Sequence, residues 1–266
     1  MAVQNLPQIK GKTIRPLNFQ VAPVVEIANP FATLSLEEIL QRHPYLPEST
    51  AVLGVCEDGL PILLDLTDPN PGSVLVGSTH IEGSTRLLQT ALLSTLICTT
   101  ANDLNILVVS RDPSAWQPFQ ALAGQHILEI LPVFDRASGP AILRFSRILD
   151  QRMNGRTRGG IHLLLVDDID YLNRVDFDVQ INFQWFAKEG ARHRMWTLAA
   201  IQPEKVEQND PFIGAFRTRI LGYVNDPFHS TWLANTRPPD TGSFHPTQQF
   251  CVRIQRNWMN FWLPGR

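Results

Sequence analysis

The segment from Val74 to Leu88 combines glycines, hydroxyl side chains and a change from strand-like to helix-like spacing. Val74-Leu-Val is a short apolar strand, and Ser84 to Thr99 has the apolar spacing of a helix. A glycine-flanked turn between a strand and a helix can bind phosphate, because backbone N–H groups at the helix start surround the anion. The residues placed to do so are Gly77, Ser78, Thr79, Gly83, Ser84 and Thr85.

This loop lacks the lysine that normally reaches the β- and γ-phosphates. Ser84 occupies the lysine position, while the Thr85 hydroxyl remains available for Mg²⁺. The interval between Gly77 and Gly83 is one residue longer than in the motif, and it contains Glu82. A carboxylate beside a triphosphate weakens binding through like-charge repulsion. Taken alone, a turn of glycine, serine and threonine before a helix is most often an ordinary turn that caps the helix.

Other cations are poorly placed to replace the missing lysine. No lysine occurs between Lys12 and Lys188. Arg86 lies two residues beyond Ser84, a rotation of about 200° around an α-helix, so we expect it to point away from a bound phosphate.

A second segment, His162 to Asp170, reads as a buried strand that ends in two carboxylates. This is the form of a Walker B strand, in which the first acid organises Mg²⁺ and the second polarises the attacking water. Asp167 is the candidate metal residue and Asp168 the candidate catalytic residue. The alternative is a strand-end turn whose aspartates face solvent or cap the next helix.

The composition supports a folded α/β protein. The chain has 266 residues, 44% hydrophobic and 18% charged, which excludes a disordered chain. Its formal net charge of −2 forces no strongly basic surface, so any contact with nucleic acid must come from a local patch. The three cysteines and seven histidines show no spacing typical of a metal site. With no signal pattern and no apolar stretch long enough to span a bilayer, we expect a cytoplasmic protein.

The chain divides into an extension and one domain. Residues 1–48 are rich in proline, with one short helix predicted from Ser35 to Arg42. Residues 49–266 open with a hairpin that turns on Asp58-Gly59 and then alternate apolar strands with helices. This order predicts a mainly parallel sheet flanked by helices, with β-hairpins at the start and end.

Several segments, taken in order over about residues 50–264, resemble the FtsK/SpoIIIE-type P-loop motor ATPases of the HerA/FtsK group in a degenerate form. The matching segments are the hairpin 53–66, the phosphate loop and first helix 77–96, the strand with its Asp-Pro ending 104–113, the Walker B strand 162–170, the strand ending in Ala-Ala-Ile-Gln-Pro 190–203, the Arg-Ile strand 216–220 and the closing hairpin 249–264.

The resemblance implies a RecA-like P-loop NTPase fold, ATP and Mg²⁺ as ligands, and a ring of subunits with nucleotide sites between neighbours. It implies a sensor role for Gln202, which would act with Asp168 if the site is active. It also implies an arginine that reaches the nucleotide of the next subunit, for which Arg192, Arg217 and Arg219 are candidates.

Three functions follow as hypotheses. The favoured one is a hydrolysis-deficient ATPase-fold subunit, nucleotide-responsive or structural, in a ring-shaped translocation machine, since losing a cation at the γ-phosphate slows phosphoryl transfer. The second is an active translocase of duplex DNA with an atypical Walker A loop. The third is a non-enzymatic module of a secretion-type complex that docks protein or peptide through Gln184-Trp-Phe-Ala and Trp258, Phe261 and Trp262.

Overall fold

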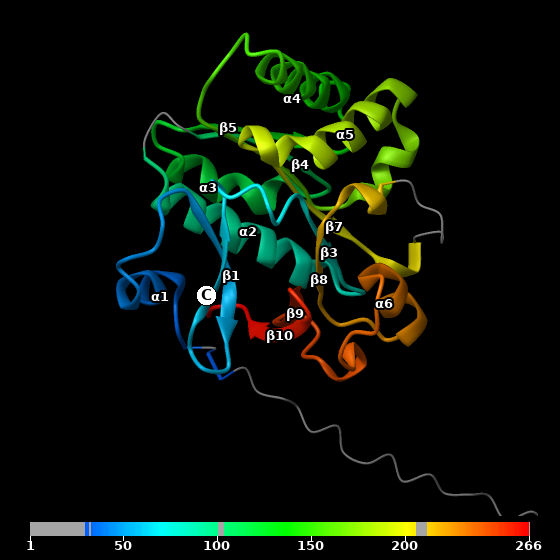
Figure 1. Cartoon of the computed structure of the whole chain (residues 1–266). Helices are drawn as coiled ribbons and strands as arrows, with labels where there is room; N and C mark the ends of the chain where they lie inside the picture. The colour runs from blue at the N-terminus through cyan, green and yellow to red at the C-terminus, as the bar shows by residue number, and fades with distance from the viewer. Residues whose placement is uncertain (1–29, 32, 101–103, 206–211, 266) are drawn as a thin grey trace, which may run out of the picture.

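The computed structural model describes residues 30–31, 33–100, 104–205 and 212–265. Its centre is a ten-stranded sheet with the order β2-β1-β10-β9-β8-β3-β7-β6-β4-β5 (Figure 1). The strands from β8 to β5 run parallel to one another, and the strands from β2 to β9 pair antiparallel. The predicted sheet with hairpins at its start and end is therefore confirmed.

The parallel half consists of short apolar strands. They are β3 (Val74–Gly77), β4 (Leu104–Ser110), β5 (Ile127–Pro132), β6 (Ile161–Val166), β7 (Met195–Ile201) and β8 (Thr218–Leu221). Every residue of β3, β6 and β7 is buried, as expected for parallel strands covered on both faces.

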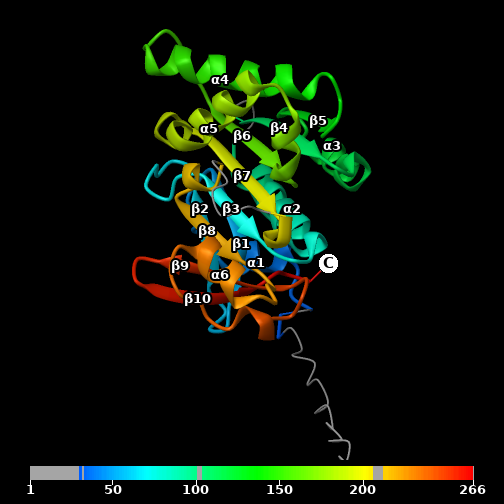
Figure 2. The same cartoon turned by 90° about the vertical axis from the view of Figure 1, so that its right-hand side faces the viewer.

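Helices supply that cover on the two faces. Leu88 and Leu92 of α2 (Ile81–Cys98) pack in one hydrophobic cluster with Val76 of β3. Helices α4 (Ser138–Met153) and α5 (Phe177–Glu189) belong to a second cluster with Leu75 of the same strand. Figure 2 shows α2 and α5 on opposite sides of β7.

The antiparallel half extends the sheet with two hairpins. Strands β1 (Thr50–Cys56) and β2 (Pro61–Asp65) form the first, and its turn contains Gly59 with φ +83°, a conformation that favours glycine. Strands β9 (Gln249–Ile254) and β10 (Asn257–Trp262) form the second, and β10 also pairs with β1. The closing segment is thereby joined to the opening one.

Three shorter helices complete the described fold: α1 (Leu36–Arg42), α3 (Gln117–Leu122) and α6 (Pro227–Ala234). Helix α1 has the predicted capping box, in which the Ser35 hydroxyl accepts from the Glu38 N–H and the Glu38 carboxylate accepts from the Ser35 N–H. Leu34 and Ile39 pack against Val55 of β1. The domain boundary predicted at residue 48 stays a prediction, and residues 1–29 lie outside the described part.

The structure differs from the sequence prediction at several elements. Helix α2 begins at Ile81, three residues before the expected start at Ser84. Helix α3 and strand β5 were not predicted, because both are partly exposed and lack a clear apolar period.

Candidate functional site

A pocket of about 390 Å³ lies at the carboxyl ends of β4, β6 and β7 and at the start of α2. It is lined by Ile81, Glu82, Thr85, Arg86, Gln89, Arg111, Asp112, Ala115, Asp167 and Gln202, and we call it the strand-end pocket. The structure therefore brings together Thr85, Asp167 and Gln202, three of the residues proposed to handle Mg²⁺ and nucleotide. A crevice at this edge is the usual ligand position in open α/β sheets.

The start of α2 decides which of its side chains reach this pocket. Because the helix begins at Ile81, Glu82, Thr85, Arg86 and Gln89 follow an i, i+3, i+4, i+7 pattern and share one face. The expectation that Arg86 points away from the site is wrong, because the pocket lies on the Arg86 side of the helix and Ser84, about 200° away around the axis, is buried. One guanidinium nitrogen of Arg86 donates to the Pro264 carbonyl at 3.2 Å.

The turn between β3 and α2 contains only Ser78, Thr79 and His80, and its N–H groups already have acceptors. The Ser78 N–H donates to the Ile201 carbonyl at 3.2 Å, and the Thr79 N–H donates to the Tyr223 carbonyl at 2.9 Å. The His80 N–H donates to the Ser78 hydroxyl at 3.2 Å. A phosphate cradle needs such N–H groups aimed at the anion, whereas these are satisfied by protein oxygens.

The remaining loop residues lie in packed surroundings rather than in the lining of the pocket. A Cβ at Gly83 would lie 2.9 Å from the Thr247 Cα, and a Cβ at Gly77 would lie 2.7 Å from a Leu233 methyl carbon. Ser84 is 1% exposed, and its hydroxyl has no hydrogen-bond partner among the described residues. The side chain at the proposed lysine position is thus directed into the protein.

Asp167, the proposed Mg²⁺ ligand, is 3% exposed, and its carboxylate already accepts three hydrogen bonds. The donors are the Ser110 hydroxyl, the Arg111 N–H at 3.0 Å and the Trp116 indole N–H at 3.4 Å. Burial raises the pKa of Asp167 above its usual range, although these donors act in the opposite direction. No hydrogen bond joins Asp167 to Thr85 among the described contacts.

Asp168, the proposed catalytic acid, is fully buried and forms an ion pair with Arg111. Its other oxygen accepts from the Asp170 N–H at 3.0 Å and caps the 3-10 helix Ile169–Arg174. Burial raises the pKa of this carboxyl, and the Arg111 charge lowers it by a smaller amount. Asp168 is not among the residues that line the strand-end pocket.

Gln202 and Glu204, which follow β7, connect the turn Ser78–His80 to the end of that strand. The Thr79 hydroxyl donates to the Glu204 carboxylate, and the Gln202 amide donates to the Thr79 carbonyl at 3.4 Å. Sequence reasoning did not find Arg111 or Glu204. The signal for the ion pair was available in the sequence. Arg111 comes directly after β4, and Asp167 and Asp168 come directly after β6, which pairs with β4.

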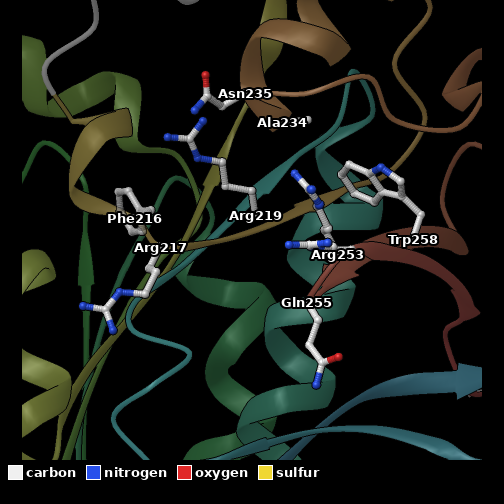
Figure 3. Close-up of a pocket in the computed structure, with 9 residues that line it drawn as sticks. Phe216, Arg217, Arg219, Ala234, Asn235, Arg253, Gln255 and Trp258 are labelled. Carbon is white, nitrogen blue, oxygen red and sulfur yellow. The ribbon is translucent and has the colours of Figure 1, made fainter.

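The three arginines proposed to act on a neighbouring subunit have different surroundings. Arg192 pairs with Glu189 at 2.8 Å on the surface. Arg217 and Arg219 line a separate pocket of about 500 Å³ at the amino end of β8 (Figure 3). Since β8 runs parallel to β3, these two arginines lie at the opposite end of the strands from the strand-end pocket.

The aromatic docking surface expected from the sequence is not present as such. Phe186 and Phe261 are fully buried and Trp262 is 3% exposed, so these rings belong to the core. Trp185 and Trp258 are only partly buried. Within the described ranges, no group of three or more His, Cys, Asp or Glu side chains is arranged to hold a metal ion, and none of the helices has the length and apolar character needed to cross a membrane.

The fold is that of solved ATPase domains. The chain superposes on the cytoplasmic domain of EssC with a TM-score of 0.63 and 14% identity, over 88% of this chain and 46% of that one. It matches Thermomonospora curvata EccC, ATPases 2 and 3 in complex with a signal sequence peptide, with a TM-score of 0.62 and 14% identity, over 84% of this chain and 42% of that one. The match to the pCW3 conjugation coupling protein TcpA, solved as a monomer with ATPγS, has a TM-score of 0.57 and 16% identity, over 81% of this chain and 66% of that one.

These comparisons confirm the predicted resemblance at the level of the fold. The chain spans less than half of the matched EssC and EccC chains. No protein-family model matches the sequence, and no curated protein is significantly similar to it. Function must therefore be argued from the site, because many functions share one fold.

Proposed function

We propose that this chain is a hydrolysis-deficient ATPase-fold subunit of a translocation machine. The observation that carries the proposal is the turn Ser78–His80, whose N–H groups donate to protein oxygens where a nucleotide-binding loop would offer them to phosphate. Binding a triphosphate in the usual manner would require breaking these bonds, and no lysine would compensate for the loss.

The carboxylates support the same proposal. Mg²⁺ coordination by Asp167 would compete with its bonds to Ser110, Arg111 and Trp116. Asp168 is held by Arg111 and by the N–H of Asp170, and it does not line the pocket in which an attacking water would lie. The loss of a single stabilising group from a phosphoryl-transfer site slows the reaction by about 10²-fold or more, and here several groups are changed together.

The assembly is part of the proposal. EssC, EccC and TcpA carry ATPase domains of this fold, and the matched EssC and EccC structures are of cytoplasmic domains. In line with these structures, the proposal is a cytoplasmic, ring-forming or stacked subunit that works beside itself or an active partner. Its cargo is protein or duplex DNA.

The test measures ATP affinity with and without Mg²⁺, ATP turnover and the mass of the assembly for the purified chain. We expect an oligomer whose turnover is no faster than that of the Asp167→Ala variant. The Asp170→Ala variant is the matched control, because this neighbouring carboxylate does not line the pocket. Turnover that Asp167→Ala abolishes and Asp170→Ala preserves would overturn the proposal.

Two additions to this assay separate the alternatives. Hydrolysis stimulated by duplex DNA, together with salt-dependent DNA binding, would identify an active translocase. A non-enzymatic docking module would instead bind a discrete peptide without any change in turnover. The peptide-binding test is included because the EccC domains were solved in complex with a signal sequence peptide.

A further inference from the structure

The pocket at the amino end of β8 is lined by several side chains of the same positive charge. Four arginines line it, Arg217, Arg219, Arg253 and Arg256, together with Phe216, Ala234, Asn235, Gln255 and Trp258. No carboxylate is among these lining residues. We call it the arginine pocket (Figure 3).

The strand register concentrates positive charge at one point of the sheet. Strand β8 pairs with β9 at Ile220↔Val252 and Leu221↔Cys251, and the pairing stops there. One further step would place Arg219 opposite Arg253, and like charges at directly opposed positions are destabilising. Arg253 in turn pairs with Trp258 of β10, so an aromatic ring borders the charged group on the same face.

The four guanidinium groups differ in how firmly the protein holds them. Arg219 is half-buried and donates to the Leu233 carbonyl at 2.7 Å, while Arg217 donates to the Asn70 carbonyl at 3.0 Å. Arg253 and Arg256 are exposed and make no hydrogen bond or ion pair with any residue that the structure describes. Two anchored arginines and two unpaired ones thus line the same pocket, with no carboxylate among the lining residues.

The β9–β10 turn adds an independent observation. It has only two residues, Gln255 and Arg256, and both line the arginine pocket. Gln255 has φ +57°, a left-handed conformation in which a two-residue turn usually carries glycine or asparagine. The turn holds Gln255 and Arg256 beside Arg253 in the lining of the pocket.

We propose that the arginine pocket binds a compact polyphosphate anion, independently of Mg²⁺. Arginine forks match phosphate oxygens in pairs, and a polyphosphate brings several negative charges into one small volume. The volume of about 500 Å³ suits a small ligand, whereas an acidic peptide would have to spread its carboxylates over a longer groove. Burial lowers the pKa of Arg219, a cost that an anion in contact with it would offset.

The first experiment titrates the full chain with inorganic tripolyphosphate in EDTA by calorimetry. We expect saturable binding that Arg253→Ala and Arg256→Ala each weaken by about tenfold, the size of one charge-assisted hydrogen-bond pair. Arg147→Ala is the matched control, because Arg147 is exposed on α4 and makes no hydrogen bond or ion pair with the residues that the structure describes, and it should bind like the wild type. Asp167→Ala should also bind normally, which separates this site from the strand-end pocket.

A second set of titrations identifies the source of the phosphate and the competing partners. Tighter binding of ATP than of tripolyphosphate in EDTA assigns the site to nucleoside polyphosphates, and the reverse order assigns it to inorganic chains. The absence of binding would overturn the proposal, as would equal loss in Arg147→Ala and Arg253→Ala. So would tighter binding of a poly-glutamate peptide or of duplex DNA through the same arginines.

Discussion

The two polar pockets lie at opposite ends of the strands, and their charged groups are treated in opposite ways. In the strand-end pocket, Asp167 accepts three hydrogen bonds, and Arg111, which also lines it, pairs with Asp168. In the arginine pocket, Arg253 and Arg256 have no partner among the described residues. A site resembling an ATP site is thus internally satisfied, while a site with no motif keeps free binding capacity. Satisfied groups stabilise the fold, and unsatisfied ones are available to ligands.

The largest effect is expected at the ion pair between Asp168 and Arg111. Asp168→Ala removes the buried partner of Arg111 and a cap of the following 3-10 helix, and it should destabilise the chain by about 2–3 kcal/mol. The larger losses measured for fully buried ion pairs are not expected, because the Arg111 side chain is 39% exposed and solvent screens its charge. Urea unfolding measures the change. Glu129→Ala, which breaks the surface pair with Arg144, should cost less than about 1 kcal/mol, and equal costs would contradict the comparison.

A smaller loss is expected where the loop 245–248 covers the start of α2. Gly83→Ala places a Cβ 2.9 Å from the Thr247 Cα, so the added methyl group should destabilise by about 1 kcal/mol after the usual helix gain is subtracted. At Gly139 the nearest atom is a Val179 methyl carbon at 3.2 Å, which can move, and Gly139→Ala is the control. Thermal unfolding of both variants checks this, and a stabilised Gly83→Ala chain would show that the loop does not pack there.

A further change should appear in the pH dependence of stability. Burial raises the pKa of Asp167 above its ordinary value of 3.8, so the folded chain holds this proton at pH values at which the unfolded chain has lost it. The stability from this group is therefore present at low pH and lost as the pH rises above 3.8 through the folded pKa. The Asp167→Asn variant should lose less stability over this interval, measured by urea unfolding at several pH values. A steeper loss of stability in the variant would mean that the folded state lowers the pKa of Asp167, contrary to this prediction.

The smallest effect is expected in the arginine pocket. Arg253→Ala should change the free energy of unfolding by no more than about 0.5 kcal/mol, and relief of repulsion favours a gain. Urea unfolding beside the Arg147→Ala control measures it. A loss well above 1 kcal/mol would mean that Arg253 is already paired, and the contrast between the two pockets would fail.

Most of the fold was predictable from local patterns. The runs Ile161–Val166 and Met195–Ile201 are apolar apart from His162 and Thr197, and such strands are stable only with cover on both faces. Two local features were also readable: the capping box at Ser35 and Glu38, and the turn at Gly59. Each depends only on neighbours within a few residues. Strand β5 was missed because its place at the sheet edge leaves Ile127 and Pro132 exposed and removes the apolar signal.

The candidate site was predictable only in part. Thr85, Asp167 and Gln202 do meet in one pocket, as the order of the segments indicated. Which face of α2 lines it was not readable: Ser84, at the lysine position of the motif, is buried, while Arg86, about 200° away around the helix, lines the pocket. The face that a helix turns toward a pocket is decided by packing against segments that are distant in the chain.

The order of strands and helices and the absence of a lysine near the loop were determined by the sequence, because they depend on residue type and local periodicity. Two features were decided only by the tertiary structure: the acceptors of the turn N–H groups come from Ile201 and Tyr223, and the arginine pocket gathers β8 with the β9–β10 turn. Each depends on contacts between residues that are distant in the chain. Such contacts form only when the sheet assembles, and no local pattern encodes them.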